Sequence, residues 1–195
     1  HGPKYWKYLT KELPVMCQSL FALSDRQEDT FIGGLSMGAH GAMKWALMDP
    51  DRFAAALIMS GAARHPDIIK NFAPLKKPKQ LEEMDPDLMP MPEMKYIYGD
   101  LDAFKGGPHD AYAAAKRNAE AGKMSTKFFF TCGGNDGSLD RCRQGYEELK
   151  ALGYDASFEE VPGYAHEWDF WDLSLRKAIR EWLPIRHAAM YPGEE

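Results

Sequence analysis

A serine between two glycines lies where a strand-like run meets a helix-like run, in residues 30–39. The spacing Gly34-x-Ser36-x-Gly38 predicts a sharp strand-to-helix turn that strains the serine backbone and projects its hydroxyl from the end of a sheet. Because glycine has no side chain, Gly34 and Gly38 would let the strand and the helix approach without a clash. The helix dipole would favour negative charge beside Ser36. The alternative is an ordinary glycine-rich turn with no chemical role.

The rest of the chain alternates between strand-like and helix-like segments. Apolar runs rich in aromatic and β-branched residues predict buried strands, and apolar residues three or four positions apart predict helices. Strands that alternate with helices indicate an α/β fold with a mostly parallel sheet and helices on both faces. The expected strands are residues 30–32, 54–60, 127–132 and 156–161, and the expected helices are residues 5–16, 41–48, 110–121, 139–152 and 168–183.

The first and last helices are amphipathic, so their large apolar residues predict the faces that pack on the domain. The face expected in the first helix consists of Tyr5, Leu9, Leu13 and Met16. The face expected in the last helix consists of Trp171, Leu175, Ile179 and Trp182.

Between about residues 61 and 107 this regular pattern breaks down, and prolines recur among methionines. A long irregular segment inside a compact domain is usually either functional or mobile. We therefore expect a cap or lid over the site in this segment. Its methionines would either line an adaptable apolar pocket or simply fill gaps in the core.

Two further residues have the chemistry and the placement needed to activate Ser36. A serine nucleophile needs a base, and the base needs a carboxylate that orients it. In a parallel α/β sheet such groups gather beyond the carboxyl ends of the strands. Asp136 follows the third expected strand and His166 follows the fourth, which is the order Ser, Asp, His of α/β-hydrolases. The alternatives are that Asp136 only closes a turn and that His166 is an ordinary loop residue. The histidines that do not follow a strand are His1, His40, His65, His109 and His187.

Composition excludes several other classes of function. With 24 basic and 29 acidic residues the net charge is −5, so we expect no nucleic-acid partner. No apolar run approaches the length of a membrane span, so we expect no membrane partner. The cysteines Cys17, Cys132 and Cys142 have no metal-ligand spacing and are odd in number, which favours a reducing, cytoplasmic location.

Over nearly its whole length the chain resembles the esterase D-type group of the α/β-hydrolases, which includes tributyrin esterases, S-formylglutathione hydrolases, and feruloyl and acetyl-xylan esterases. The resemblance rests on GGLSMG at 33–38, CGGND at 132–136 and GYAHEWDFW at 163–171. It implies that Ser36 is the nucleophile. It also implies that Asp136 is the orienting acid and His166 the general base.

The same resemblance implies a serine carboxylesterase that hydrolyses short-chain acyl esters, or acetyl and feruloyl esters of carbohydrates, through an acyl-enzyme. The backbone N–H of Met37 would be one oxyanion donor, and no metal or cofactor would take part. Trp168, Tyr164 and His40 are expected to bind the small ester substrate, and His40 stands where the group often has tyrosine or glycine. An acyltransferase on the same fold and a non-catalytic binding module remain the alternatives.

The chain departs from this group ahead of the serine. An α/β-hydrolase has several strands before the nucleophile strand and a second oxyanion donor in one of their loops, whereas here only a helix precedes that strand. The nucleophile strand would then be an apolar sheet edge, which seeks a partner. We therefore expect residues 1–195 to be the C-terminal part of one α/β-hydrolase domain. A missing N-terminal segment or a homo-oligomer partner would cover the exposed edge.

Overall fold

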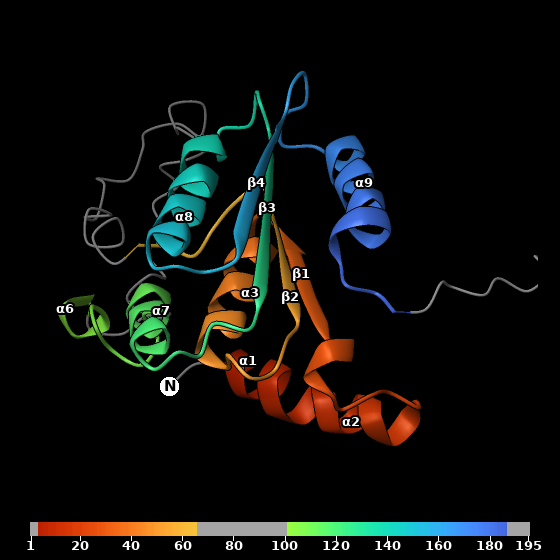
Figure 1. Ribbon diagram of the computed structural model, residues 1–195, viewed down its shortest axis with the longest axis vertical. Coiled ribbons are helices and arrows are strands. Elements are labelled where there is room, and N and C mark those ends of the chain that lie inside the picture. Colours follow the sequence, from red (N-terminus) through yellow and green to blue (C-terminus); the bar gives the residue numbers. More distant parts are fainter. Residues whose placement is uncertain (1–3, 66–100, 187–195) are drawn as a thin grey trace, which may run out of the picture.

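The computed structural model describes residues 4–65 and 101–186, and within them one parallel sheet lies between layers of helices (Figure 1). The strands are β1 Phe31–Leu35, β2 Ala55–Met59, β3 Lys127–Gly133 and β4 Ala156–Val161, and they are neighbours in the sheet in the same order as in the chain. The α-helices are α1 Tyr5–Lys7, α2 Leu13–Leu20, α3 Met37–Met48, α6 Leu101–Phe104, α7 Ala111–Glu120, α8 Leu139–Ala151 and α9 Trp168–Lys177. Turns of π-helix at Tyr8–Glu12 and Ala178–Trp182 and a 3-10 turn at Gln27–Asp29 complete the helical elements.

The predicted α/β fold with a parallel sheet is confirmed. Each pair of neighbouring strands is parallel, with Gly34 opposite Ile58 and Ile58 opposite Phe130. Local sequence signals mark both the start and the end of α7. Asp110 accepts hydrogen bonds from two backbone N–H groups of the first turn of α7, and Gly122 beyond that helix has a φ of 68°, which suits glycine.

The two faces of the sheet are covered differently because strand side chains point alternately to opposite sides. On one face Ile58, Phe128 and Phe130 pack with α3, α7 and α8 into the larger core. On the other face Leu57 and Phe129 pack with α9 and the turn that follows it. Figure 1 shows α3, α7 and α8 on one side of the strands and α9 on the other.

Both terminal helices form where predicted, but the predicted buried face is wrong in the first helix and only partly right in the last, where Trp171 and Trp182 pack on the core. In the first helix Tyr5, Leu9 and Met16 are largely exposed, and the side facing α3 carries Trp6 and the buried Thr10. In the last helix Leu175 and Ile179 are exposed, and the side facing the sheet consists of Phe170, Trp171, Ser174 and Ala178. In the last helix the true face is rotated from the predicted one, because the small Ser174 and Ala178 are buried in place of Leu175 and Ile179.

The predicted irregular segment of residues 61–107 falls mainly on residues 66–100, which lie outside the described residues. Its described end contains the short helix α6, where no regular element was expected. The cap or lid therefore stays a prediction.

Strand β1 pairs only with β2 among the described residues, so its other edge has no partner there. Every residue of β2 is buried, whereas Gly33 in the middle of β1 is exposed. This is the exposed edge that the sequence predicts. The boundaries of the whole domain stay a prediction.

Candidate active site

Ser36 lies in a strained turn between β1 and α3. It has φ 54° and ψ −115°, and a positive φ is unfavourable for any residue with a side chain. The Ser36 N–H donates to the carbonyl of Met59 at 2.9 Å, which fastens the turn to β2. A Cβ on Gly34 would lie 2.2 Å from the carbonyl oxygen of Gly38, so Gly34 has to be glycine. The same expectation for Gly38 is wrong, since a Cβ there would meet no described heavy atom within 4 Å.

The structure brings the three residues predicted to form a triad into hydrogen-bond contact. His166 Nε2 lies 2.9 Å from Ser36 Oγ, and His166 Nδ1 lies 2.9 Å from Asp136 Oδ2. Ser36 follows β1, Asp136 follows β3 and His166 follows β4, and the carboxyl ends of parallel strands meet at one edge of the sheet. The distances and the order of contacts suit proton transfer from a hydroxyl to an imidazole that a carboxylate orients.

Asp136 is a buried carboxylate with several donors. Only 1% of its side chain is exposed, and Oδ1 accepts the Ser138 N–H at 2.7 Å. Burial raises the pKa of Asp136, but hydrogen bonds from Ser60, the Ser138 amide and His166 outweigh burial and hold that pKa below its usual value. Asp136 therefore closes a turn, as the alternative interpretation expects, and also faces the imidazole as an anion.

Backbone hydrogen bonds hold the His166 loop against the Asp136 loop. The Asn135 N–H donates to Tyr164 O at 2.9 Å. A Cβ on Gly133 would lie 2.4 Å from the same Tyr164 oxygen, so the close approach depends on glycine at the end of β3. The loops therefore place imidazole and carboxylate together although the residues are 30 positions apart in the chain.

An apolar groove of about 770 Å³ begins at Ser36 and runs over β1 and β2. Met37, Trp168 and Leu175 line it, and the Trp168 side chain is 74% exposed. Met37 is the first residue of α3, directly after Ser36, where the sequence places one oxyanion donor. Within the described residues we assign no second donor.

The other two residues predicted to bind substrate do not line the groove. Tyr164 packs against Phe170, with ring centroids 6.0 Å apart. His40 accepts a hydrogen bond from the Arg64 N–H on Nδ1, and burial, together with the charges of Lys44, Arg64 and Arg141, lowers the pKa of His40 to about 4. Neither residue faces the groove, because Tyr164 is held in the core and His40 points toward Arg64.

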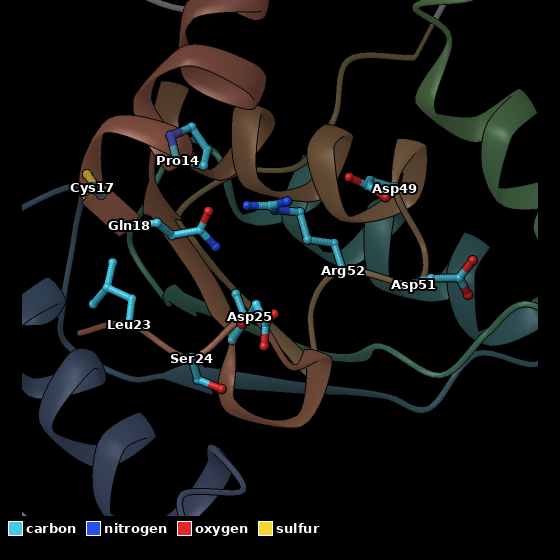
Figure 2. Close-up of a pocket in the computed structure, with 10 residues that line it drawn as sticks. Pro14, Cys17, Gln18, Leu23, Ser24, Asp25, Asp49, Asp51 and Arg52 are labelled. Carbon is cyan, nitrogen blue, oxygen red and sulfur yellow. The ribbon is translucent and has the colours of Figure 1, made fainter. Parts of the chain in front are cut away.

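A smaller hollow of about 290 Å³ lies at the opposite end of the strands from Ser36 (Figure 2). It is lined by Thr30, which precedes β1, and by Arg52, which precedes β2, so it lies at the amino ends of the strands. The Arg52 guanidinium lies over the rings of Trp45 and Phe53. This hollow therefore lies at the end of the sheet away from Ser36.

Two contacts of the site were not predicted from the sequence. The Ser60 hydroxyl lowers the pKa of Asp136 through a side-chain hydrogen bond, and the ring of Trp171 packs edge to face on His166 with centroids 4.9 Å apart. A signal for Ser60 is present in the sequence: Ser60-Gly61 follows a buried strand at the same edge as Ser36. The sequence predicts Trp171 on the buried face of the last helix but does not predict its contact with His166.

The structure also bears on membranes, metals and disulfides. None of the helices in residues 4–65 and 101–186 is long and apolar enough to cross a membrane. The same residues contain no group of three or more His, Cys, Asp or Glu side chains that could hold a metal ion. Cys17, Cys132 and Cys142 are free thiols.

Comparison with known proteins finds similar proteins over most of the chain. A family model described as putative esterase matches residues 1–181. An acetyl esterase of Caldicellulosiruptor saccharolyticus is 27% identical over 179 residues, which are 92% of this chain and 63% of that protein. A substrate-bound structure of fluorophosphonate-binding serine hydrolase F of Staphylococcus aureus is 26% identical, with a TM-score of 0.73 over 95% of this chain and 65% of its own.

An S-formylglutathione hydrolase of Staphylococcus aureus is also 26% identical, with a TM-score of 0.71 over 95% of this chain and 65% of its own. The chain thus spans only 63–65% of the length of these relatives.

Proposed function

The chain belongs to the putative esterase family, and on that basis we propose that it is a serine carboxylesterase. The observation that carries the proposal is the pair of contacts on one imidazole: His166 Nε2 on Ser36 Oγ and His166 Nδ1 on Asp136. A hydroxyl, a base and an orienting carboxylate in that order are what acyl transfer through a covalent intermediate needs.

In the proposed reaction Ser36 Oγ attacks the ester carbonyl carbon while His166 Nε2 takes its proton. The Met37 N–H stabilises the negative oxygen of the tetrahedral intermediate at the N-terminus of α3. The intermediate collapses, the C–O bond to the alcohol breaks, and His166 returns the proton to the leaving alkoxide. His166 then deprotonates a water molecule that releases the acid from Ser36. Asp136 holds the imidazole in the tautomer with its proton on Nδ1 and stabilises the imidazolium that forms.

The groove supports a small apolar acyl group or an aromatic group as the part of the substrate bound next to Ser36. Its lining near Ser36 consists of Met37, Leu35 and the exposed ring of Trp168. We therefore propose short-chain acyl esters, or acetyl and feruloyl esters of carbohydrates, as the substrate class, with Trp168 as the contact for a sugar or phenolic ring. The acetyl esterase among the relatives supports the acetyl group.

We also propose that further chain, either an N-terminal segment or a second copy, covers the free edge of β1 and supplies the second oxyanion donor. The exposed Gly33 and the open groove over β1 support this proposal. A cytoplasmic location is a further proposal, supported by the free thiols of Cys132 and Cys142.

The decisive experiment compares full-length wild type with Ser36→Ala in hydrolysis of p-nitrophenyl acetate. We expect a loss of at least about 10⁴-fold in kcat, because the nucleophile is removed. Ser174→Ala is the matched control, since this buried serine on α9 has a hydroxyl without a hydrogen-bond partner among the described residues. Equal rates in wild type and Ser36→Ala would refute the proposed function.

A further inference from the structure

A single side chain from α9, Trp171, contacts both the proposed base His166 and the buried Ser60. The Trp171 indole N–H donates to Ser60 Oγ at 2.9 Å. The Trp171 ring packs on the His166 ring at an interplanar angle of 89°, with centroids 4.9 Å apart. The His166 side chain is 40% exposed. The Trp171 ring therefore covers one side of an imidazole that solvent reaches from another side.

Ser60 connects the indole to the carboxylate. It is fully buried, it directly follows β2, and its hydroxyl helps to lower the pKa of Asp136 through a side-chain hydrogen bond. A hydroxyl has one proton to donate. Since Ser60 Oγ accepts the proton of the Trp171 indole, its own proton is directed to Asp136.

The backbone of Ser60 is strained in the same way as that of Ser36. Its φ is 53°, close to the 54° of Ser36, and no other described non-glycine residue has a positive φ. Backbone strain of this kind persists where the surrounding structure enforces it, and it gathers at functional sites. The Ser60 N–H donates to the carbonyl of Thr131 in β3 at 2.9 Å, which fixes the residue that follows β2 against the neighbouring strand.

We infer, on the basis of the proposed function, that Ser60 and Trp171 are positioning residues for the Asp136–His166 pair. Trp171 sets the direction of the Ser60 hydroxyl, the hydroxyl sets the rotation of the Asp136 carboxylate, and the Trp171 ring limits the swing of His166. Neither residue touches the reacting atoms. Their removal lowers kcat by misplacing the base, whereas KM, which depends on the groove, stays nearly unchanged.

The first test is Ser60→Ala in the full-length protein, with kcat and KM measured separately on p-nitrophenyl acetate. We expect kcat to fall about 10- to 100-fold, less than the roughly 10⁴-fold lost when a triad acid no longer holds the correct tautomer. KM should stay within about twofold. The control is Ser174→Ala, which should leave kcat and KM at the wild-type values. Ser174 is buried on α9, and its hydroxyl has no hydrogen-bond partner among the described residues.

Trp171→Phe separates the indole N–H from the ring. It retains an aromatic ring next to His166 but removes the donor to Ser60, so we expect a three- to tenfold loss in kcat. Because the indole acts on Asp136 through Ser60, the double variant Ser60→Ala with Trp171→Phe should lose little more kcat than Ser60→Ala alone. Trp182→Phe is the matched control, since Trp182 stacks on Phe129 in the same C-terminal helical segment.

Ser60→Gly distinguishes positioning from a structural role. It removes the hydroxyl as Ser60→Ala does but tolerates the positive φ, so we expect a melting temperature about 2–4 °C above that of Ser60→Ala and the same loss in kcat. Recovery of kcat in Ser60→Gly would attribute the loss to strain and overturn the inference. Equal kcat in Ser60→Ala and Ser174→Ala, with Ser36→Ala inactive, would overturn the inference and leave the proposed function intact. An inactive wild type would overturn both.

Discussion

Among the described residues, one face of the sheet is covered by α3, α7 and α8 and the other by α9 (Figure 1). Within the same residues the second face is open over β1 and β2, where the groove that begins at Ser36 lies. The covered face holds the larger core, in which Ile58, Phe128 and Phe130 are almost fully buried. The open face offers the hydroxyl to a ligand. The difference teaches that the closely packed side holds α3 behind the strained turn of Ser36, while the groove on the other side leaves Ser36 open to a small ligand among the described residues.

Neighbouring residues in one strand face opposite sides, so each strand offers a matched pair of positions for testing this comparison. Phe129 and Phe130 are such a pair on β3, and Gly33 and Gly34 are another on β1.

The largest expected effect is that of Phe130→Ala, because this ring is 1% exposed and packs between Phe128 and Tyr146. We expect the free energy of unfolding to fall by about 3–5 kcal/mol. Phe129→Ala, on the open face and half-buried against Trp182, should cost only about 1–2 kcal/mol. Urea unfolding of both variants measures the difference, and equal losses would mean that the open face is as well covered as the other.

Gly34→Ala should come next. The added Cβ would lie 2.2 Å from the Gly38 carbonyl oxygen, so β1 and α3 would have to separate, at a cost of about 3 kcal/mol. At Gly33, on the open face, the nearest described atom would be Leu57 Cβ at 3.4 Å, and Gly33→Ala should change stability by no more than about 0.5 kcal/mol. Thermal melts compare the two, and a tolerated Gly34→Ala would contradict the close approach of β1 and α3.

A smaller effect, confined to low pH, is expected from His40. Its folded pKa of about 4 lies below the ordinary 6.5, so the stability that it contributes is fully present above pH 6.5 and is lost as the pH falls through 4. We expect the wild type to lose on the order of 2–3 kcal/mol from this group between pH 7 and pH 4. His40→Asn keeps an acceptor for the Arg64 N–H but cannot be protonated there, so it should lack this loss.

The measurement for His40 is urea unfolding of both proteins at pH 7, 5.5 and 4. The difference between the two curves isolates His40, because the carboxylates titrate equally in both proteins. Parallel curves would show that the imidazole is accessible to solvent in the folded state.

The elements of the fold could be predicted because they depend on local signals. The fourth strand was expected at residues 156–161 and is found there, and the third is longer than expected by one residue. The convergence of Ser36, Asp136 and His166 follows from strand ends alone, since every parallel strand delivers its carboxyl end to the same edge. Their catalytic roles stay a proposal until Ser36→Ala is measured.

The orientation of the terminal helices could not be predicted in the same way. Apolar residues surround much of each helix, so the period of the pattern indicates a helix but does not choose the buried side. In the first helix the buried side is the one that carries Trp6, which packs on Trp45. In the last helix the buried side includes Ser174 and Ala178, which are small enough to lie close to the sheet. The partner surface decides between faces whose hydrophobicity is similar.

The sequence by itself determined the order of strands and helices, the strained turn at Ser36 and the chain positions of Asp136 and His166, because each depends on residues that are close together in the chain. Only the tertiary structure decided that Trp171 contacts His166 and, across 111 positions, Ser60. It also decided that His40 is half-buried, accepts a hydrogen bond from the Arg64 N–H and does not line the groove. Such contacts depend on how packed elements face one another, and periodicity along the chain carries no information about the side chain on the opposite surface.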